Sequence, residues 1–272
     1  MNITIVGYGD IGQQLIFTLA MNKGIQNINI ITESNIDGKL LDISEFLISM
    51  DLNPNKVRVN DDHILSSSKI VIITSAHKNS HSLKNRNDMY SYNLPIVLRR
   101  VREILNKGYK QKIVIITNPM EKIMCAIYKN CHIDSENLFG IGTTLDTIRY
   151  QAITGSERVL IGQHGKRLYE LDINLGAVQD IVECEIMQKI NERVTNICKE
   201  KQKTVLGVTG VATSLVASML TREKKIFLLS KILKVNDLIS CTSIPIEVSS
   251  EGFNNKKIKG IEKIKKEFIE EI

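Results

Sequence analysis

The chain has 272 residues, enough for one large domain or two smaller domains that share an interface. Hydrophobic residues make up 43% of it, as in ordinary globular proteins, and no apolar run approaches the ~20 residues of a membrane span. The net charge of +6 is mild and no nucleic-acid-binding motif accompanies it, so neither a membrane nor a nucleic acid is an expected partner.

The cysteines indicate a reducing compartment. There are five of them, an odd number, and they are scattered without a CxxC pair or a Cys/His cluster. The first strand candidate begins at the start of the chain, with no basic and apolar leader before it. We therefore expect free thiols, no metal site and a cytoplasmic location.

The first half of the chain alternates short β-branched runs with helical patterns. The predicted strands are 3–6, 28–32, 57–59, 70–74, 113–117 and 138–141, and the predicted helices are 11–22, 38–50, 89–106 and 121–129. The runs at 70–74 and 113–117 are almost entirely Ile and Val, which is typical of strands buried on both faces. This order predicts an α/β fold with a Rossmann-type doubly wound parallel sheet.

The second half has a different pattern and predicts a smaller α+β domain. Long helical patterns run from about 181 to 201 and from about 210 to 220, and a strand–turn–strand region at roughly 227–247 precedes a terminal helix. We place the division near Thr143, giving a nucleotide-binding domain of residues 1–143 and a substrate domain of residues 144–272.

A glycine-rich loop follows the first predicted strand and opens the first helix. Its sequence, Gly7-Tyr8-Gly9-Asp10-Ile11-Gly12, matches G-x-G-x-x-G, in which glycines permit a tight turn and close approach to a pyrophosphate at the helix N-terminus. Its cofactor-binding residues are predicted to be Gly7, Gly9, Asp10, Ile11 and Gly12, with the Asp10 side chain turned away from the phosphates.

An acid follows this loop at the spacing that the dinucleotide fingerprint requires. Glu33 lies about 20 residues downstream, at the end of the second predicted strand. A carboxylate there can accept hydrogen bonds from a ribose 2′-hydroxyl and repels a 2′-phosphate. The sequence therefore predicts NAD rather than NADP as the cofactor, against the alternative that Glu33 is a surface acid.

Chemistry-bearing residues cluster in the segment 140–165. Asp146 and Arg149 share one helix face at i and i+3, and His164 follows between two glycines. A His–carboxylate pair can donate and accept a proton, and an arginine can bind a carboxylate with two parallel hydrogen bonds. The alternative is a surface ion pair and an unrelated loop histidine.

These segments together resemble the NAD-dependent lactate/malate dehydrogenase family in chain order. The resemblance is carried by GYGDIG, GIQNINIITE, GKLLDISE, IVIITSA, IVIITNPMEKI, GIGTTLDTIRYQ, IGQHG and GVATSL. It implies His164 as proton donor, Asp146 as its orienting acid, and Arg86, counted back from Asn93, as a loop arginine that polarises the substrate carbonyl. Arg149 and Asn118 would bind substrate, with a cis bond allowed between Asn118 and Pro119.

The resemblance implies further contacts and an assembly. Cofactor contacts would also come from Thr74, Ser75, Ala76, Asn93, Thr117 and Asn118. The ligand would be a small 2-oxo or 2-hydroxy acid, and the assembly a homodimer or homotetramer. The chain departs from the family pattern in the GQHGKR segment, in Ala76 at a usual glycine, and in an Asp146–His164 spacing about nine residues shorter than usual.

Substrate choice is predicted from the loop and from one late glycine. Malate enzymes carry a second arginine where this chain has Asn79 or Ser80, so a monocarboxylic 2-oxo acid is expected: pyruvate or a larger, branched-chain analogue. Gly207 stands where a threonine commonly lines the side-chain pocket, which favours a larger side chain. The alternatives are a malate dehydrogenase, or a catalytically weak NAD-binding protein of the same fold, suggested by the shortened second domain; an NAD-dependent glycosidase is a remote one.

Overall fold

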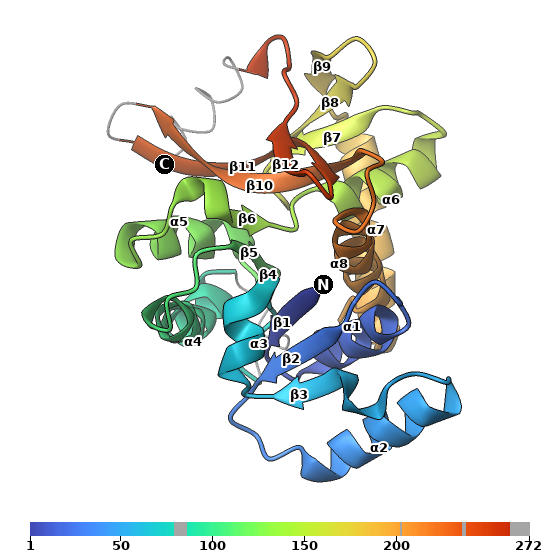
Figure 1. Cartoon of the computed structure of the whole chain (residues 1–272). Helices are drawn as coiled ribbons and strands as arrows, with labels where there is room; N and C mark the ends of the chain where they lie inside the picture. Colours follow the sequence, from blue (N-terminus) through green and yellow to red (C-terminus); the bar gives the residue numbers. More distant parts are fainter. Residues whose placement is uncertain (79–85, 202, 236–237, 262–272) are drawn as a thin grey trace.

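The computed structural model describes residues 1–78, 86–201, 203–235 and 238–261, and its first half is built on parallel strands (Figure 1). Strands and helices alternate in the order β1 (Asn2–Val6), α1 (Asp10–Ala20), β2 (Asn27–Ile31), α2 (Asp37–Ser49), β3 (Val57–Val59), α3 (Asp62–Ser67), β4 (Ser68–Ile73), α4 (Arg86–Asn106), β5 (Lys112–Ile115), α5 (Met120–Asn130) and β6 (Leu138–Gly140). Short 3₁₀ helices at Pro54–Lys56 and Ser135–Asn137 precede β3 and β6.

The parallel strands lie in the order β3-β2-β1-β4-β5-β6. That order is the Rossmann arrangement, in which ligands bind beyond the carboxyl ends of the strands near the reversal of strand order between β1 and β4. The central strands are covered on both faces, and Ile70 through Ile73 of β4 are fully buried. The fold class predicted from the sequence is thus confirmed.

Helices cover both faces of this sheet. In Figure 1, α1 lies on one side together with α8, whereas α4 and α5 lie on the other. The buried face of α1 consists of Gly12, Leu15, Ile16, Leu19 and Ala20, at the i, i+3, i+4 and i+7 spacing of an amphipathic helix. In the described parts of the chain, every helix is too short or too polar to cross a bilayer.

The second half continues the same sheet with antiparallel strands. Its elements are α6 (Thr144–Thr154), β7 (Val159–Gly162), β8 (Leu168–Asp172), β9 (Ala177–Ile181), α7 (Cys184–Lys201), α8 (Leu206–Ser218), β10 (Lys225–Val235), β11 (Leu238–Ser249) and β12 (Gly252–Asn255). The β10–β11 hairpin joins β6 on one side and β7 on the other, so the segment around residue 164 lies beside the end of the parallel sheet.

The structure corrects the sequence-based view of residues 155–183. The sequence analysis named no strand there and predicted a helix from about residue 181, but β7, β8 and β9 form an antiparallel meander and α7 begins only at Cys184. These strands are short, and β8 (LYELD) lacks β-branched residues. Its acid, Glu170, is nearly buried and accepts a 2.6 Å hydrogen bond from Arg158, a partner that no local pattern reveals.

The other predicted helices and strands are mostly confirmed, whereas the predicted division into two domains is not tested. The predicted elements of the first half match the structure to within a few residues, except that α3 was not expected; the strand–turn–strand region is the β10–β11 hairpin. The terminal helix falls largely outside the described residues. Parallel pairing ends at β6, next to the predicted division at Thr143, but β10 continues the sheet, and the two-domain division stays a prediction.

The glycine loop offers a test of this packing. A Cβ on Gly12 would lie 2.2 Å from the carbonyl oxygen of Gly7, whereas a Cβ on Gly9 would meet nothing within 4 Å. We expect Gly12→Ala to destabilise the fold by about 1–3 kcal/mol, because the clash outweighs the gain in helix propensity of roughly 1 kcal/mol. Gly9→Ala, the matched control, should stay within about 0.5 kcal/mol. Urea unfolding measures both, and equal stabilities of the two variants would contradict this packing.

Candidate active site

Asp146 is the centre of the candidate site. It lies in the first turn of α6, its side chain is only 5% exposed, and it has two cationic or potentially cationic partners. Asp146 Oδ2 lies 2.6 Å from His164 Nδ1, and Asp146 Oδ1 accepts a 3.1 Å hydrogen bond from Arg149 Nη1. The structure thus brings together the three residues that the sequence analysis selected from this segment.

The chain between Asp146 and His164 is short, yet it turns back so that the two side chains meet. Helix α6 ends at Gly155, whose φ of +70° allows an immediate reversal into β7. Two hydrogen bonds then fasten β7 to α6, from Thr143 Oγ1 to the carbonyl of Leu160 at 2.5 Å and from the N–H of Leu160 to Thr147 Oγ1 at 2.9 Å. The shortened spacing is therefore compatible with a close His–Asp contact.

Two hydrogen bonds hold the chain at His164 and at the residue before it. The N–H of His164 donates to Glu121 Oε1 at 3.1 Å, which ties the histidine to the start of α5. Gln163 is buried and its Nε2 donates to the carbonyl of Cys241 on β11 at 3.0 Å. Where the family pattern has an acid, this chain therefore has an amide that anchors the segment to the hairpin.

This arrangement is suited to proton transfer next to an anion. A carboxylate at Nδ1 fixes the ring tautomer and stabilises the protonated ring, so Nε2 is the nitrogen that can exchange a proton with a ligand. Arg149 donates one N–H group to Asp146. A guanidinium has five N–H donors, so further N–H groups can bind the carboxylate of a ligand.

A pocket of about 630 Å³ is lined by Arg149 and extends to helix α1. Its lining residues come from α1, α6, α7, the linker to α8 and the first residues of α8: Asp10, Gln13, Gln14, Leu145, Arg149, Arg193, Ile197, Glu200, Lys201, Lys203, Thr204, Val205, Leu206 and Gly207. Gly207 is thus placed with Arg149, as expected. A Cβ on Gly207 would lie 3.1 Å from Leu145 Cδ1, so Leu145 fills part of the space that the glycine leaves.

Polar residues at the ends of β4 and β5 are joined by one buried side chain. Asn93 is 2% exposed; its Oδ1 accepts from the N–H of His77 at 2.8 Å, and its Nδ2 donates to the carbonyl of Asn118 at 2.7 Å. The Asn118–Pro119 bond is cis, as the sequence analysis allowed. Asn93 therefore fixes the two strand ends relative to each other, and its contact with a cofactor stays a prediction.

The glycine loop has the shape that a dinucleotide pyrophosphate needs. Gly7 has φ of +109°, and a Cβ there would lie 2.9 Å from atoms of Thr74 and Ser75, so the loop packs directly on the end of β4. Open space lies above Gly9 at the N-terminus of α1. Asp10 forms an ion pair with Lys203, so its carboxylate is engaged beside α8. These residues fit an NAD pyrophosphate.

Glu33 lies two residues beyond β2 and is not a lone acid. Arg99 binds both of its carboxylate oxygens, one through Nη1 and the other through Nη2 at 3.1 Å, and Arg100 Nη2 lies 3.2 Å from Oε2. The hydrogen bond from Arg99, followed by the charge of Arg100, lowers the pKa of the Glu33 carboxyl. The structure therefore places two arginines next to Glu33, the residue predicted to bind the ribose, and the sequence pattern did not indicate them.

The side chains of three predicted site residues lie outside the part of the chain that the structure describes. Asn79 and Ser80 lie outside the described residues, and Arg86 is the first residue of α4, with its side chain outside the description. Ala76, Thr117 and Ile11 lie at the strand ends and the loop as expected, and Thr117 Oγ1 donates to the carbonyl of Ser75 at 2.8 Å. Within the ranges described, no group of three His, Cys, Asp or Glu side chains is placed to bind a metal ion.

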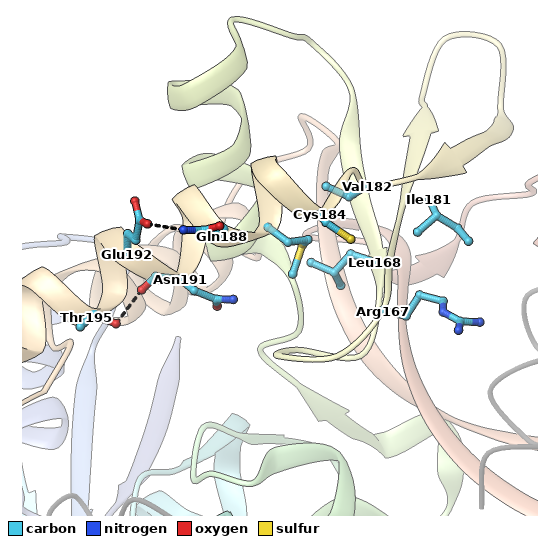
Figure 2. Close-up of a pocket in the computed structure, with 10 residues that line it drawn as sticks. Arg167, Leu168, Ile181, Val182, Cys184, Gln188, Asn191, Glu192 and Thr195 are labelled. Atoms are coloured by element: carbon cyan, nitrogen blue, oxygen red, sulfur yellow. Dashed lines mark hydrogen bonds between the residues drawn. The ribbon is translucent and has the colours of Figure 1, made fainter.

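A second pocket, of about 650 Å³, lies between α7 and the β8–β9 strands (Figure 2). It is lined by Arg167, Leu168, Ile181, Val182, Cys184, Met187, Gln188, Asn191, Glu192 and Thr195. Figure 2 shows Gln188 and Glu192 bonded to each other along the helix, and none of the predicted site residues borders this pocket. Of the two pockets, the one beside Arg149 is lined by residues that the sequence analysis selected.

Sequence reasoning missed several residues of the site. Glu121 lies in the IVIITNPMEKI segment, and an acid two residues after Asn-Pro at a helix start was the available signal. Leu145 and Arg193 gave no local signal, because their place in the pocket depends on how α6 and α7 pack. The Arg99–Arg100 pair resembles any charged helix face until α4 is placed beside the end of β2.

Comparisons with known proteins place the chain in a family. Residues 1–140 match the family model described as lactate/malate dehydrogenase, NAD binding domain. Among curated proteins, the L-lactate dehydrogenase of Acetivibrio thermocellus is 26% identical over 96% of this chain and 93% of its own length. The malate dehydrogenase of Methanothermobacter marburgensis is 23% identical over 93% of this chain and 87% of its own length.

Solved structures share the fold over the full chain. The malate dehydrogenase of Archaeoglobus fulgidus, solved in complex with NADH, superposes with a TM-score of 0.80 at 21% identity, covering 100% of this chain and 99% of that one. The minor L-lactate dehydrogenase of Enterococcus mundtii gives a TM-score of 0.76 at 20% identity, covering 99% and 95%.

Proposed function

The chain belongs to the lactate/malate dehydrogenase family of NAD-dependent 2-hydroxyacid dehydrogenases, and we propose that it acts on a monocarboxylic substrate, as an L-lactate-type enzyme. The observation that carries the proposal is that one buried carboxylate, Asp146, engages both His164 and Arg149. The proposed proton donor, His164, is thereby held close to Arg149, the proposed ligand of the substrate carboxylate, and Arg149 lines the pocket of about 630 Å³.

The residues divide the work of reducing a 2-oxo acid. NAD, when bound as NADH, supplies the hydride. Arg149 binds the substrate carboxylate through the N–H groups that do not engage Asp146, and His164 Nε2 gives a proton to the carbonyl oxygen. Asp146 orients the ring and stabilises its protonated form. Arg86 is proposed to polarise the carbonyl, and Asn118 to bind substrate or cofactor.

The lining of the pocket supports an aliphatic side chain on the substrate. Leu145, Ile197, Val205 and Leu206 contribute an apolar wall around Gly207, which fits pyruvate or a larger, branched-chain analogue. Asn79 and Ser80 stand uncharged where a malate enzyme has an arginine, and an uncharged site does not compensate the burial of a second carboxylate. We expect a cytoplasmic homodimer or homotetramer by resemblance to the family.

A second candidate function is malate dehydrogenase. Arg193 of α7 lines the same pocket as Arg149, and a second guanidinium there could pair with a distal carboxylate. A third candidate, a catalytically weak NAD-binding protein, is favoured if NADH binds without being oxidised by any 2-oxo acid.

Turnover with different 2-oxo acids distinguishes these candidates. We expect kcat/KM with NADH to be higher for pyruvate or 2-oxoisocaproate than for oxaloacetate, because Leu145, Ile197, Val205 and Leu206 form an apolar part of the pocket lining. Spectrophotometric assays of the three acids measure this. If oxaloacetate is preferred, and Arg193→Gln selectively lowers its kcat/KM by tenfold or more, the malate candidate replaces the lactate-type one.

Removal of the histidine tests the catalytic assignment. His164→Ala should lower kcat/KM by about 10²–10⁴, the usual contribution of a general acid, while NADH still binds. His63→Ala removes an exposed histidine on α3 and is the matched control, with activity expected to stay near wild type. Steady-state kinetics and NADH fluorescence titration give both readouts. Activity in His164→Ala equal to that of the control would rule out the proposed role.

A further inference from the structure

The adenosine end of the nucleotide site contains a four-residue charge cluster rather than a single acid. Arg99 and Arg100 of α4 both bind Glu33, and both also bind Glu103 one turn further along the helix, at 3.1 Å from Arg99 and 2.9 Å from Arg100. The cluster contains two positive and two negative charges. The carboxylate that was predicted to repel a 2′-phosphate is therefore neutralised locally.

The contacts also limit what Glu33 can offer to a ribose. A carboxylate has about four acceptor positions, and three contacts from the two arginines already occupy Glu33. Little acceptor capacity remains for a ribose hydroxyl, so the usual basis for preferring NAD over NADP is weakened.

The arginines are placed to contribute binding of their own. The side chain of Arg99 is 46% exposed and that of Glu33 is 62% exposed, so both face solvent at the edge where the acid of a dinucleotide site lies. The planar fork of an arginine matches the geometry of phosphate oxygens, and an arginine near this position accommodates a 2′-phosphate. A rotation of the exposed Glu33 side chain would leave the Nη2 group of Arg99 available to a phosphate oxygen, because only Nη1 also binds Glu103.

We infer that Arg99, with Arg100 behind it, is a cofactor-specificity residue that lets this chain bind NADPH nearly as well as NADH. The inference concerns the NAD-binding domain and does not depend on which 2-oxo acid is the substrate. A lone acid at this position would place like charges together, at a cost of several kcal/mol, which corresponds to a hundredfold or more in affinity. The charge cluster reduces that discrimination.

The test is direct binding of both nucleotides to the full chain, without any 2-oxo acid. Isothermal titration gives the ratio of Kd for NADPH to Kd for NADH, which we expect to be below tenfold for the wild type. Arg99→Gln should raise that ratio at least tenfold, because the fork for the 2′-phosphate is lost. Glu33→Gln should lower the ratio below one, because both guanidinium groups become available.

Arg102→Gln is the matched control, because Arg102 is an exposed arginine on the same helix. The ion pairs of Glu33 in the described part of the chain are with Arg99 and Arg100 instead. It should change the ratio less than twofold. A wild-type ratio of tenfold or more, an Arg99→Gln ratio that rises less than tenfold, a Glu33→Gln ratio that stays at or above one, or a control effect of twofold or more would overturn the inference. Failure of both nucleotides to bind would overturn it together with the cofactor assignment, whereas failure of turnover alone would affect only the proposed substrate.

Discussion

Asp146 is a buried carboxylate, and burying a charge is unfavourable unless its partners compensate the lost hydration. Here the compensation comes from Arg149 on the same helix and from His164, which reaches Asp146 only after the chain has turned at Gly155 and run through β7. We call the contacts of Asp146 with Arg149 and His164 the Asp146 junction. Hydrogen bonds that join β7 to Thr143 and Thr147, and the His164 backbone to Glu121, hold this junction in place. The chemistry proposed for the site depends on the same junction.

The two halves of the chain meet at this place. Strand β6 ends the parallel sheet and leads within a few residues into α6, while the β10–β11 hairpin pairs with both β6 and β7. Asn93 links the ends of β4 and β5, so the loops that carry His77 and Asn118 are held against each other. The nucleotide loop and the Asp146 junction are thereby fixed relative to each other through one continuous sheet. A hydride and a proton can only be delivered to one substrate if that relation is rigid.

Much of the first half could be predicted from the sequence, because its signals are local. Unbroken Ile and Val runs indicate buried parallel strands, and the spacing of Gly7, Gly9, Gly12 and Glu33 indicates a nucleotide site. Strands β7 to β9 could not be predicted in this way, since they are short, β8 lacks β-branched residues, and β7 also pairs with Ser243 of β11, far along the chain. The same holds for Arg99 and Arg100, whose neighbour Glu33 is 66 residues from Arg99. Local patterns thus selected the proposed reacting groups, whereas the residues that contact them could be found only from the tertiary structure.

The most direct test of the central claim is a double-mutant cycle between Asp146 and His164, read as kcat with NADH and the preferred 2-oxo acid. If Asp146 acts through the histidine ring, Asp146→Asn should lower kcat at least tenfold in the wild-type background and less than twofold in the His164→Ala background. If the two losses multiply instead, Asp146 acts independently of His164. Asp146 would then be a structural partner of Arg149, and the proposed proton-donating pair would be contradicted.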